Sequence, residues 1–297
     1  MADPRAWRRL WRNPAAWISA AVLLFVVAAC VFGPFFLSPS LGDPSANQYA
    51  PPSWEHPFGT DLNGRDVLYR VLTGGRVSLV VGLCGAMVSL CIGTAWGLVA
   101  GYAGGRVGAV MMRIVDVLYS VPRLIFILIA INAFNVQVQT FASAMQWEWL
   151  VQFSRIAILI VTLGVIEWLT MARIVRGQVL ALKSRQFVLA SQALGQSHFV
   201  ILWKHLLPNL TGVILIYLTL TIPAVIIDES FLSFLGLGIQ APQASWGSLL
   251  ADGASAINPV RSFWWLLVFP ATAMAASLLA LNFLGDAMRD AFDPRGR

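Results

Sequence analysis

The sequence contains six long runs of apolar residues, and these runs place most of the chain in a lipid environment. An α-helix needs about 20 consecutive apolar residues to cross the hydrocarbon core of a bilayer. Apolar residues make up 58% of the 297-residue chain and charged residues only 11%, against roughly 25% charged residues in a soluble domain. We therefore predict an all-α, polytopic membrane protein. Its six transmembrane helices are expected at residues 17–37, 78–102, 108–134, 155–175, 211–235 and 262–285.

The first apolar run has two interpretations. Arginines within residues 1–16, followed by apolar residues, are also the pattern of a secretory signal peptide. The run is longer than a usual signal core and continues past Cys30, so we expect a membrane span at 17–37. The remaining layout is an extracytoplasmic segment at 38–77, a five-helix core at 78–286 with a polar loop at 176–209, and a tail at 287–297.

Lysine and arginine are distributed unevenly between the two sides of these spans. One side receives fourteen of them and the other receives five. Basic residues accumulate on the cytoplasmic side of membrane proteins. We therefore expect both termini and the 176–209 loop in the cytoplasm, with 38–77 outside. The net charge is +6, but the basic residues stand at the ends of the spans and not in a patch mixed with aromatic residues. Nucleic acid is therefore not an expected partner.

The 176–209 loop has its own helix punctuation. Residues 187–195 form a predicted short helix rich in small residues, and Gly195 suits its C-terminal turn. Ser197 is suited to begin a second helix, which Pro208 and Asn209 are expected to end. This helix-turn-helix is either a simple connector or a docking surface, and its pattern alone favours neither.

The same loop resembles the cytoplasmic signature of ABC importer permeases, in which E-A-A-x-x-x-G is followed nine residues on by a hydrophobic-x-Leu-Pro ending. Ala190 and Ser191 stand at the alanine positions and Gly195 at the glycine, while Leu189 replaces the glutamate and His205 the first hydrophobic residue of the ending. The resemblance implies a coupling helix that contacts an ATPase subunit. The implied coupling residues are Val188, Leu189, Ala190, Ser191, Ala193, Leu194, Gly195, His198, Phe199, His205 and Pro208.

Two further stretches resemble the C-type permeases of oligopeptide, dipeptide and nickel importers. Residues 56–66 match the H-P-x-G-T-D-x-x-G-R-D segment of that group, and residues 230–238 with 244–247 are similar to its S-F-L-G-L-G and S-W-G elements. The first segment favours a tight turn with local ion pairs, and contact with a binding protein is its second interpretation. Its candidate residues are His56, Gly59, Thr60, Asp61, Gly64, Arg65 and Asp66.

The resemblance implies one of two permease subunits of an ATP-driven importer in the bacterial cytoplasmic (inner) membrane, forming half of the pathway for di- and oligopeptides. Implied partners are a second related permease in a heterodimer, two ATPase subunits and an extracytoplasmic substrate-binding protein. ATP and Mg²⁺ are expected in the ATPase subunits, and this chain has no G-x-x-x-x-G-K-[ST] loop of its own. We therefore expect neither a cofactor nor enzymatic activity in this chain. An ion-gradient-driven secondary transporter or channel is the alternative, but it leaves the loop unexplained.

Charged residues inside the apolar runs are further candidates, because each costs about 2.5–3.5 kcal/mol to insert into a bilayer. Asp116 and Arg123 are seven residues apart and are expected on one helix face. Such residues can serve helix packing or pairing between subunits, or they can contact a peptide in the translocation pathway. We favour packing or pairing over peptide contact. The five candidates are Asp116, Arg123, Glu167, Asp228 and Glu229.

The histidines are not expected to form a metal site. His56 is predicted outside the membrane, whereas His198 and His205 are predicted inside and belong to the docking surface.

Overall fold

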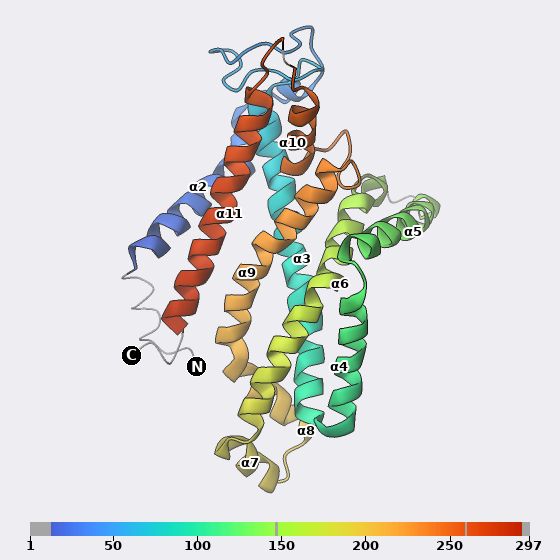
Figure 1. Cartoon of the computed structure of the whole chain (residues 1–297), viewed down its shortest axis with the longest axis vertical. Coiled ribbons are helices and arrows are strands. Elements are labelled where there is room, and N and C mark those ends of the chain that lie inside the picture. The colour runs from blue at the N-terminus through green and yellow to red at the C-terminus, as the bar shows by residue number, and fades with distance from the viewer. Residues whose placement is uncertain (1–12, 146–147, 259, 293–297) are drawn as a thin grey trace. The chain divides into compact units, whose positions relative to one another are not determined.

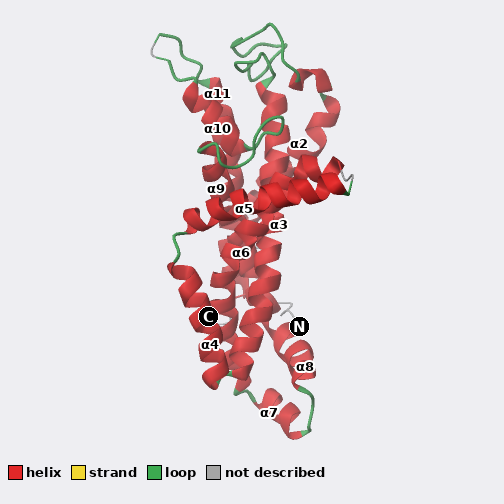
Figure 2. Cartoon of the chain, turned by 90° about the vertical axis from the view of Figure 1, so that its right-hand side faces the viewer, coloured by secondary structure: helices red, strands yellow, loops and turns green. Residues whose placement is uncertain are grey.

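The regular structure of this chain is helical. The computed structural model describes residues 13–145, 148–258 and 260–292 (Figure 1). Within them, the structure outside the helices is limited to loops and an isolated β-bridge between Thr60 and Asp66, which confirms the all-α prediction (Figure 2). The helices are α2 (Pro14–Phe36), η1 (Pro39–Gly42), α3 (Val67–Ala103), α4 (Gly105–Ser120), α5 (Arg123–Ala144), α6 (Glu148–Lys183), α7 (Gln186–Ala193), α8 (His198–Val200), η2 (Ile201–Leu206), α9 (Leu207–Phe234), α10 (Trp246–Ser255) and α11 (Trp265–Phe292).

Five helical stretches of the described residues are long and apolar enough to cross a membrane, and a sixth is counted if α4 and α5 form one span. These two helices are bent by 86° where they meet (Figure 2). The prediction of one continuous helix over 108–134 was therefore wrong. Pro122 lacks an N–H group and holds the preceding residue in an extended conformation, with Val121 at φ −75° and ψ 129°.

The chain divides into two compact units. The first contains residues 1–13, 84–222 and 285–297, and the second contains residues 14–83 and 223–284. Residues 1–12 of the expected cytoplasmic segment 1–16 lie outside the described residues, as do residues 293–297 of the tail 287–297, whose first part, 287–292, belongs to α11. Helix α3 begins at Val67, earlier than the apolar run at 78, and α6 continues to Lys183, which shortens the predicted loop.

In the first unit, α3 and α6 pack at very close range. A Cβ atom on Gly97 would lie 2.6 Å from the carbonyl oxygen of Ala172, and one on Gly93 would lie 2.5 Å from the Cβ of Met171. Glycines spaced four apart form a strip along which two membrane helices can bring their backbones together. The glycines of α3 therefore fix its position against α6.

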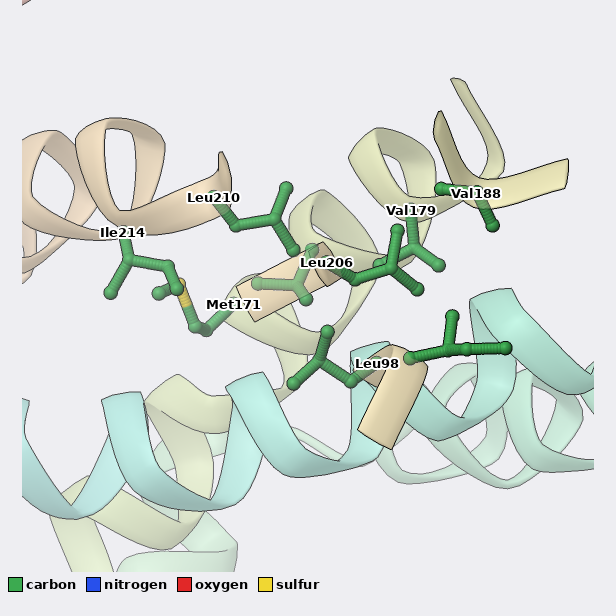
Figure 3. Packing of buried hydrophobic residues seen from close by; sticks show 9 residues of the cluster. Leu98, Met171, Val179, Val188, Leu206, Leu210 and Ile214 are labelled. Atoms are coloured by element: carbon green, nitrogen blue, oxygen red, sulfur yellow. The ribbon is translucent and has the colours of Figure 1, made fainter. Parts of the chain in front are cut away.

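A buried apolar cluster joins the ends of these two helices to the segment that follows α6. Leu98 comes from α3, Met171 and Val179 from α6, Val188 from α7, and Leu206 from η2 (Figure 3). Leu210 and Ile214 of α9 complete the labelled group (Figure 3). This cluster is the base on which the predicted coupling residues rest.

Helix α9 contradicts the prediction that Pro208 and Asn209 end a helix. The chain stays helical from His198 to Phe234, with the wider π-helical turn η2 just before the proline. Proline removes one backbone donor and crowds the preceding turn. Next to the proline, the side-chain amide of Asn209 donates to the carbonyl oxygen of His205 at 2.6 Å.

In the second unit, residues of the 38–66 segment pack on α10, α11 and the start of α3. The rings of Tyr49 and Phe263 stack at 4.2 Å between centroids, and those of Phe58 and Phe269 at 3.9 Å. The indole of Trp265 donates to the carbonyl oxygen of Thr60 at 3.2 Å. The segment is thus an ordered layer on the helices of its unit.

Candidate functional sites

The segment that connects α6 to α9 forms a helical elbow, residues 186–206. Its first arm, α7, ends in two hydrogen bonds: the N–H of Gly195 donates to Gln192 and that of Gln196 donates to Ser191. This is the Schellman pattern, in which the residue after the helix adopts a left-handed conformation. Gly195 has φ +72°, which confirms the predicted role of this glycine in the turn.

The second arm begins at Ser197, as predicted. The Oγ atom of Ser197 accepts a hydrogen bond from the N–H of Val200. One residue later, the Nδ1 atom of His198 lies 2.9 Å from the hydroxyl of Tyr102, and the ammonium group of Lys183 donates to the carbonyl oxygen of Tyr102. The second arm and the end of α6 are therefore both tied to the end of α3.

The predicted coupling residues point in two directions. Val188 is fully buried and Ser191 is 5% exposed, so these two anchor the elbow to the apolar cluster. Leu189, Leu194 and Phe199 are 51%, 80% and 72% exposed. Also exposed are Ala190, Ala193, Gly195, His198 and Pro208, whereas His205 is half-buried. Large apolar side chains in an exposed patch mark an interaction surface.

The histidines are engaged within the chain. His205 Nε2 lies 2.8 Å from the side-chain oxygen of Gln196, a contact that joins the end of the second arm to the turn between the two arms. His56 bonds to Asp66 instead. In the part of the chain that the structure describes, no group of three His, Cys, Asp or Glu residues could hold a metal ion.

The candidate charged residues in the described part of the first unit pair with residues of α6 or α5. Arg123 at the start of α5 pairs with Glu167 of α6, and Asp116 of α4 pairs with Arg173 of α6 at 3.0 Å. The prediction that Asp116 and Arg123 share one helix face was wrong, because the break at Pro122 lies between them.

The second unit holds the residues of the 56–66 motif in one hydrogen-bonded turn. Asp61 is 3% exposed, and its carboxylate accepts from the backbone N–H groups of Asn63 and Arg65 at 2.8 and 2.9 Å. It also accepts from the guanidinium groups of Arg65 and Arg70 at 2.8 and 2.7 Å. Arg70 extends this network to Asp252 of α10 at 3.0 Å.

Most of the other candidate residues of the motif face inward as well. Asp66 accepts from the N–H of Tyr69 at 2.9 Å and so caps the start of α3, while its other oxygen contacts His56. Gly59, Thr60 and Gly64 are buried, and the two glycines have φ +73° and +72°. These contacts favour the structural interpretation of the motif. Two large apolar side chains are exposed here: Trp54, just before the motif, at 103%, and Leu62, within it, at 57%.

Glu229 of α9 lies fully buried in a cage of serines. Its carboxylate oxygens accept from Ser233 at 2.7 Å, Ser78 at 3.0 Å and Ser230 at 3.3 Å. Two of these hydroxyls in turn accept backbone N–H groups, of Trp246 at Ser78 and of Ile239 at Ser233. The cage thus ties α9 to α3 and to the start of α10, whereas neighbouring Asp228 is only half-buried.

Replacing Glu229 by alanine is expected to lower the stability of the protein by about 2–3 kcal/mol, because buried hydroxyls lose their acceptor. Glu229→Gln is the matched control; it keeps the shape and one oxygen acceptor, and we expect a loss of only about 1 kcal/mol. The thermal unfolding midpoint of each variant in detergent measures both effects. Equal midpoints for Glu229→Ala and the unchanged protein would show that the cage contributes nothing.

Tyr102, Arg70 and Arg173 are among the residues that build these sites but were absent from the sequence-based candidates. Tyr102 carries no signal that separates it from any aromatic residue near a span end. Arg70 stood in the predicted outer segment, and Arg173 stood at the end of a span, where a charge is unremarkable. Their roles depend on partners from distant parts of the chain.

Comparison with known proteins gives consistent results over nearly the whole chain. Residues 93–297 match the family model described as binding-protein-dependent transport system inner membrane component, and residues 5–52 match the N-terminal TM domain of oligopeptide transport permease C. The dipeptide transport system permease protein DppC of Bacillus subtilis is 44% identical over 98% of this chain and 85% of that protein. The oligopeptide transport system permease proteins OppC of Haemophilus influenzae and Escherichia coli are each 40% identical over 98% of this chain, covering 88% and 90% of those proteins.

Proposed function

Since the chain belongs to the family of binding-protein-dependent transport system inner membrane components, we propose that it is a permease subunit of an ATP-driven importer and forms half of the translocation pathway for di- and oligopeptides. Members of this family are multi-pass membrane proteins, and the candidate spans of the described residues agree with this. The peptide substrate is inferred from the names of the dipeptide and oligopeptide permeases that it resembles.

The elbow is the single observation that carries this proposal. Its inner residues, such as Val188, are packed in the same apolar cluster as Leu98 of α3, Met171 of α6 and Leu210 of α9. Its outer residues Leu194 and Phe199 are largely exposed. A close-packed interior transmits displacement instead of absorbing it. A push on the exposed surface would therefore move three long helices together.

In this proposal the exposed surface of the elbow contacts one of two ATPase subunits, which bind ATP and Mg²⁺. Closure of the ATPase dimer on ATP displaces the elbow, and the attached helices tilt from an inward-facing to an outward-facing arrangement. A second, related permease completes the pathway. Both termini and the elbow lie in the cytoplasm, and the chain itself catalyses no reaction.

The outer segment is proposed to meet the substrate-binding protein. The 56–66 motif supports this contact indirectly, because its buried ion pairs hold the chain in place while Trp54 and Leu62 point outward. An exposed tryptophan on a rigid base is a common anchor of protein interfaces.

Uptake by the co-purified transporter in proteoliposomes tests this function. With the binding protein and radiolabelled alanyl-leucine, we expect uptake that persists when a protonophore removes the proton gradient and that stops when ATP is omitted. Proteoliposomes that contain the binding protein and radiolabelled substrate but no transporter supply the background. Uptake that requires a proton gradient, or that this chain performs without an ATPase, would support a secondary transporter instead.

A further inference from the structure

The bend between α4 and α5 borders a cavity of about 430 Å³. Leu118 and Tyr119 line it from the end of α4, Phe126 from α5, and Val165 and Leu169 from α6. Its volume lies within the range of small-molecule binding sites, which are mostly apolar with a few polar groups that orient the ligand. Among these mostly apolar lining residues, the cavity also has two charged ones, Arg123 and Glu167.

Arg123 and Glu167 both line the cavity and pair with one another. The side chain of Glu167 is 12% exposed and that of Arg123 is 42% exposed. Ionisable residues within membrane spans are costly and usually face a partner or a water-filled cavity. Here they face each other and a cavity at the same time.

The start of α5 adds positive potential on the same side. Arg123 is its first residue, and Pro122, which precedes it, provides no side-chain cap for the first N–H groups. Interrupted membrane helices commonly direct such N-termini at the carboxylate of a substrate. The cavity therefore has a positive group at Arg123, a negative group at Glu167 and apolar walls.

We propose that Arg123 and Glu167 bind the charged ends of a short zwitterionic peptide on its way through the membrane. Arg123 binds the terminal carboxylate, Glu167 binds the terminal ammonium group, and the apolar walls receive a hydrophobic side chain. When the peptide enters, each of the two residues exchanges its partner, so no charge is left unpaired. Both ends are common to all unmodified peptides, so the site accepts varied sequences. This inference rests on the proposed function in peptide import.

Reversing the ion pair tests this inference, because reversal keeps the attraction between the two residues but inverts the polarity of the site. The double variant Arg123→Glu/Glu167→Arg is expected to assemble normally. It should lose ATP-driven uptake of alanyl-leucine by roughly ten- to a hundredfold, because in the orientation that the apolar walls and the start of α5 favour, each end of the peptide then meets a like charge instead of a charged hydrogen-bond partner. The matched control is Asp116→Arg/Arg173→Asp, which reverses an ion pair whose residues do not line the cavity and should keep most of the uptake. Recovery of full uptake by the reversed Arg123 and Glu167 pair would overturn the inference.

Alkylation of a cysteine in the cavity provides a second measurement that does not depend on uptake. Thr170 lines the cavity and Val110 is an exposed residue of α4 outside it. In a chain whose three native cysteines are replaced by alanine, alanyl-leucine should slow maleimide labelling of Thr170→Cys and leave that of Val110→Cys unchanged. Adding Arg123→Met should remove the protection.

The two measurements separate this inference from the proposed function. Peptide-independent labelling of Thr170→Cys in a complex that still imports alanyl-leucine with ATP would reject the site and leave the importer intact. Absence of ATP-driven uptake by the unchanged complex would reject the importer itself.

Discussion

Replacing Gly195 by tryptophan is expected to abolish peptide uptake while the transporter remains assembled. Gly195 ends the first arm of the elbow with φ +72°, and a Cβ atom there would meet nothing within 4 Å. A large side chain would therefore project from the exposed surface instead of entering the core. It would block close approach of the ATPase subunit, which is the contact that the proposed mechanism requires.

The control for this variant is Gly195→Asn, since asparagine is the residue that most readily replaces glycine in the left-handed conformation. Backbone strain for other residues in that conformation is about 1–2 kcal/mol, too little to unfold the elbow by itself. We expect Gly195→Asn to retain most of the uptake. Uptake in proteoliposomes and co-purification of the ATPase measure the two properties, and unimpaired uptake by Gly195→Trp would reject the elbow as the coupling contact.

Replacing Asp61 by alanine is expected to have the largest effect on stability, about 3–5 kcal/mol. Asp61 is 3% exposed and is the shared partner of the guanidinium groups of Arg65 and Arg70. Without it, two largely buried positive charges and two backbone N–H groups lose their acceptor. The start of α3 and the ordered outer layer should then separate.

Asp252 provides the matched control because it pairs with the same Arg70 but its side chain is 53% exposed. Exposed ion pairs contribute about 1 kcal/mol or less, so Asp252→Ala should cost far less than Asp61→Ala. Thermal unfolding of both variants in detergent, followed by intrinsic fluorescence, measures the difference. Equal losses for the two variants would show that burial of the Asp61 network is unimportant.

The outcomes for four prolines show where sequence reasoning reached its limit. Pro34, Pro223 and Pro270 lie inside α2, α9 and α11, whereas Pro122 separates two helices bent by 86°. All four stand in or beside apolar runs. Membrane helices tolerate proline where neighbouring groups satisfy the freed carbonyl. Whether a given proline breaks a span therefore depends on its surroundings, which the local sequence does not describe.

The charged residues show the same limit in another form. The apolar runs identified Glu167, Asp116 and Glu229 as costly, but their partners lie far away in the chain: Arg173 is 57 residues from Asp116 and Ser78 is 151 residues from Glu229. Conversely, the turn at Gly195 and the cap at Ser197 were predictable, because both depend on a few consecutive residues.

The sequence by itself determined that this chain is helical, spans a membrane repeatedly and carries a small-residue elbow between two of its long helices. Helix length, apolar character and helix ends are local properties, set by the residues that take part in them. Only the tertiary structure decided that Arg123 meets Glu167 beside a cavity and that the 56–66 motif turns its charges inward. A charge in an apolar environment is stabilised by whichever partner the packing of distant helices brings within reach.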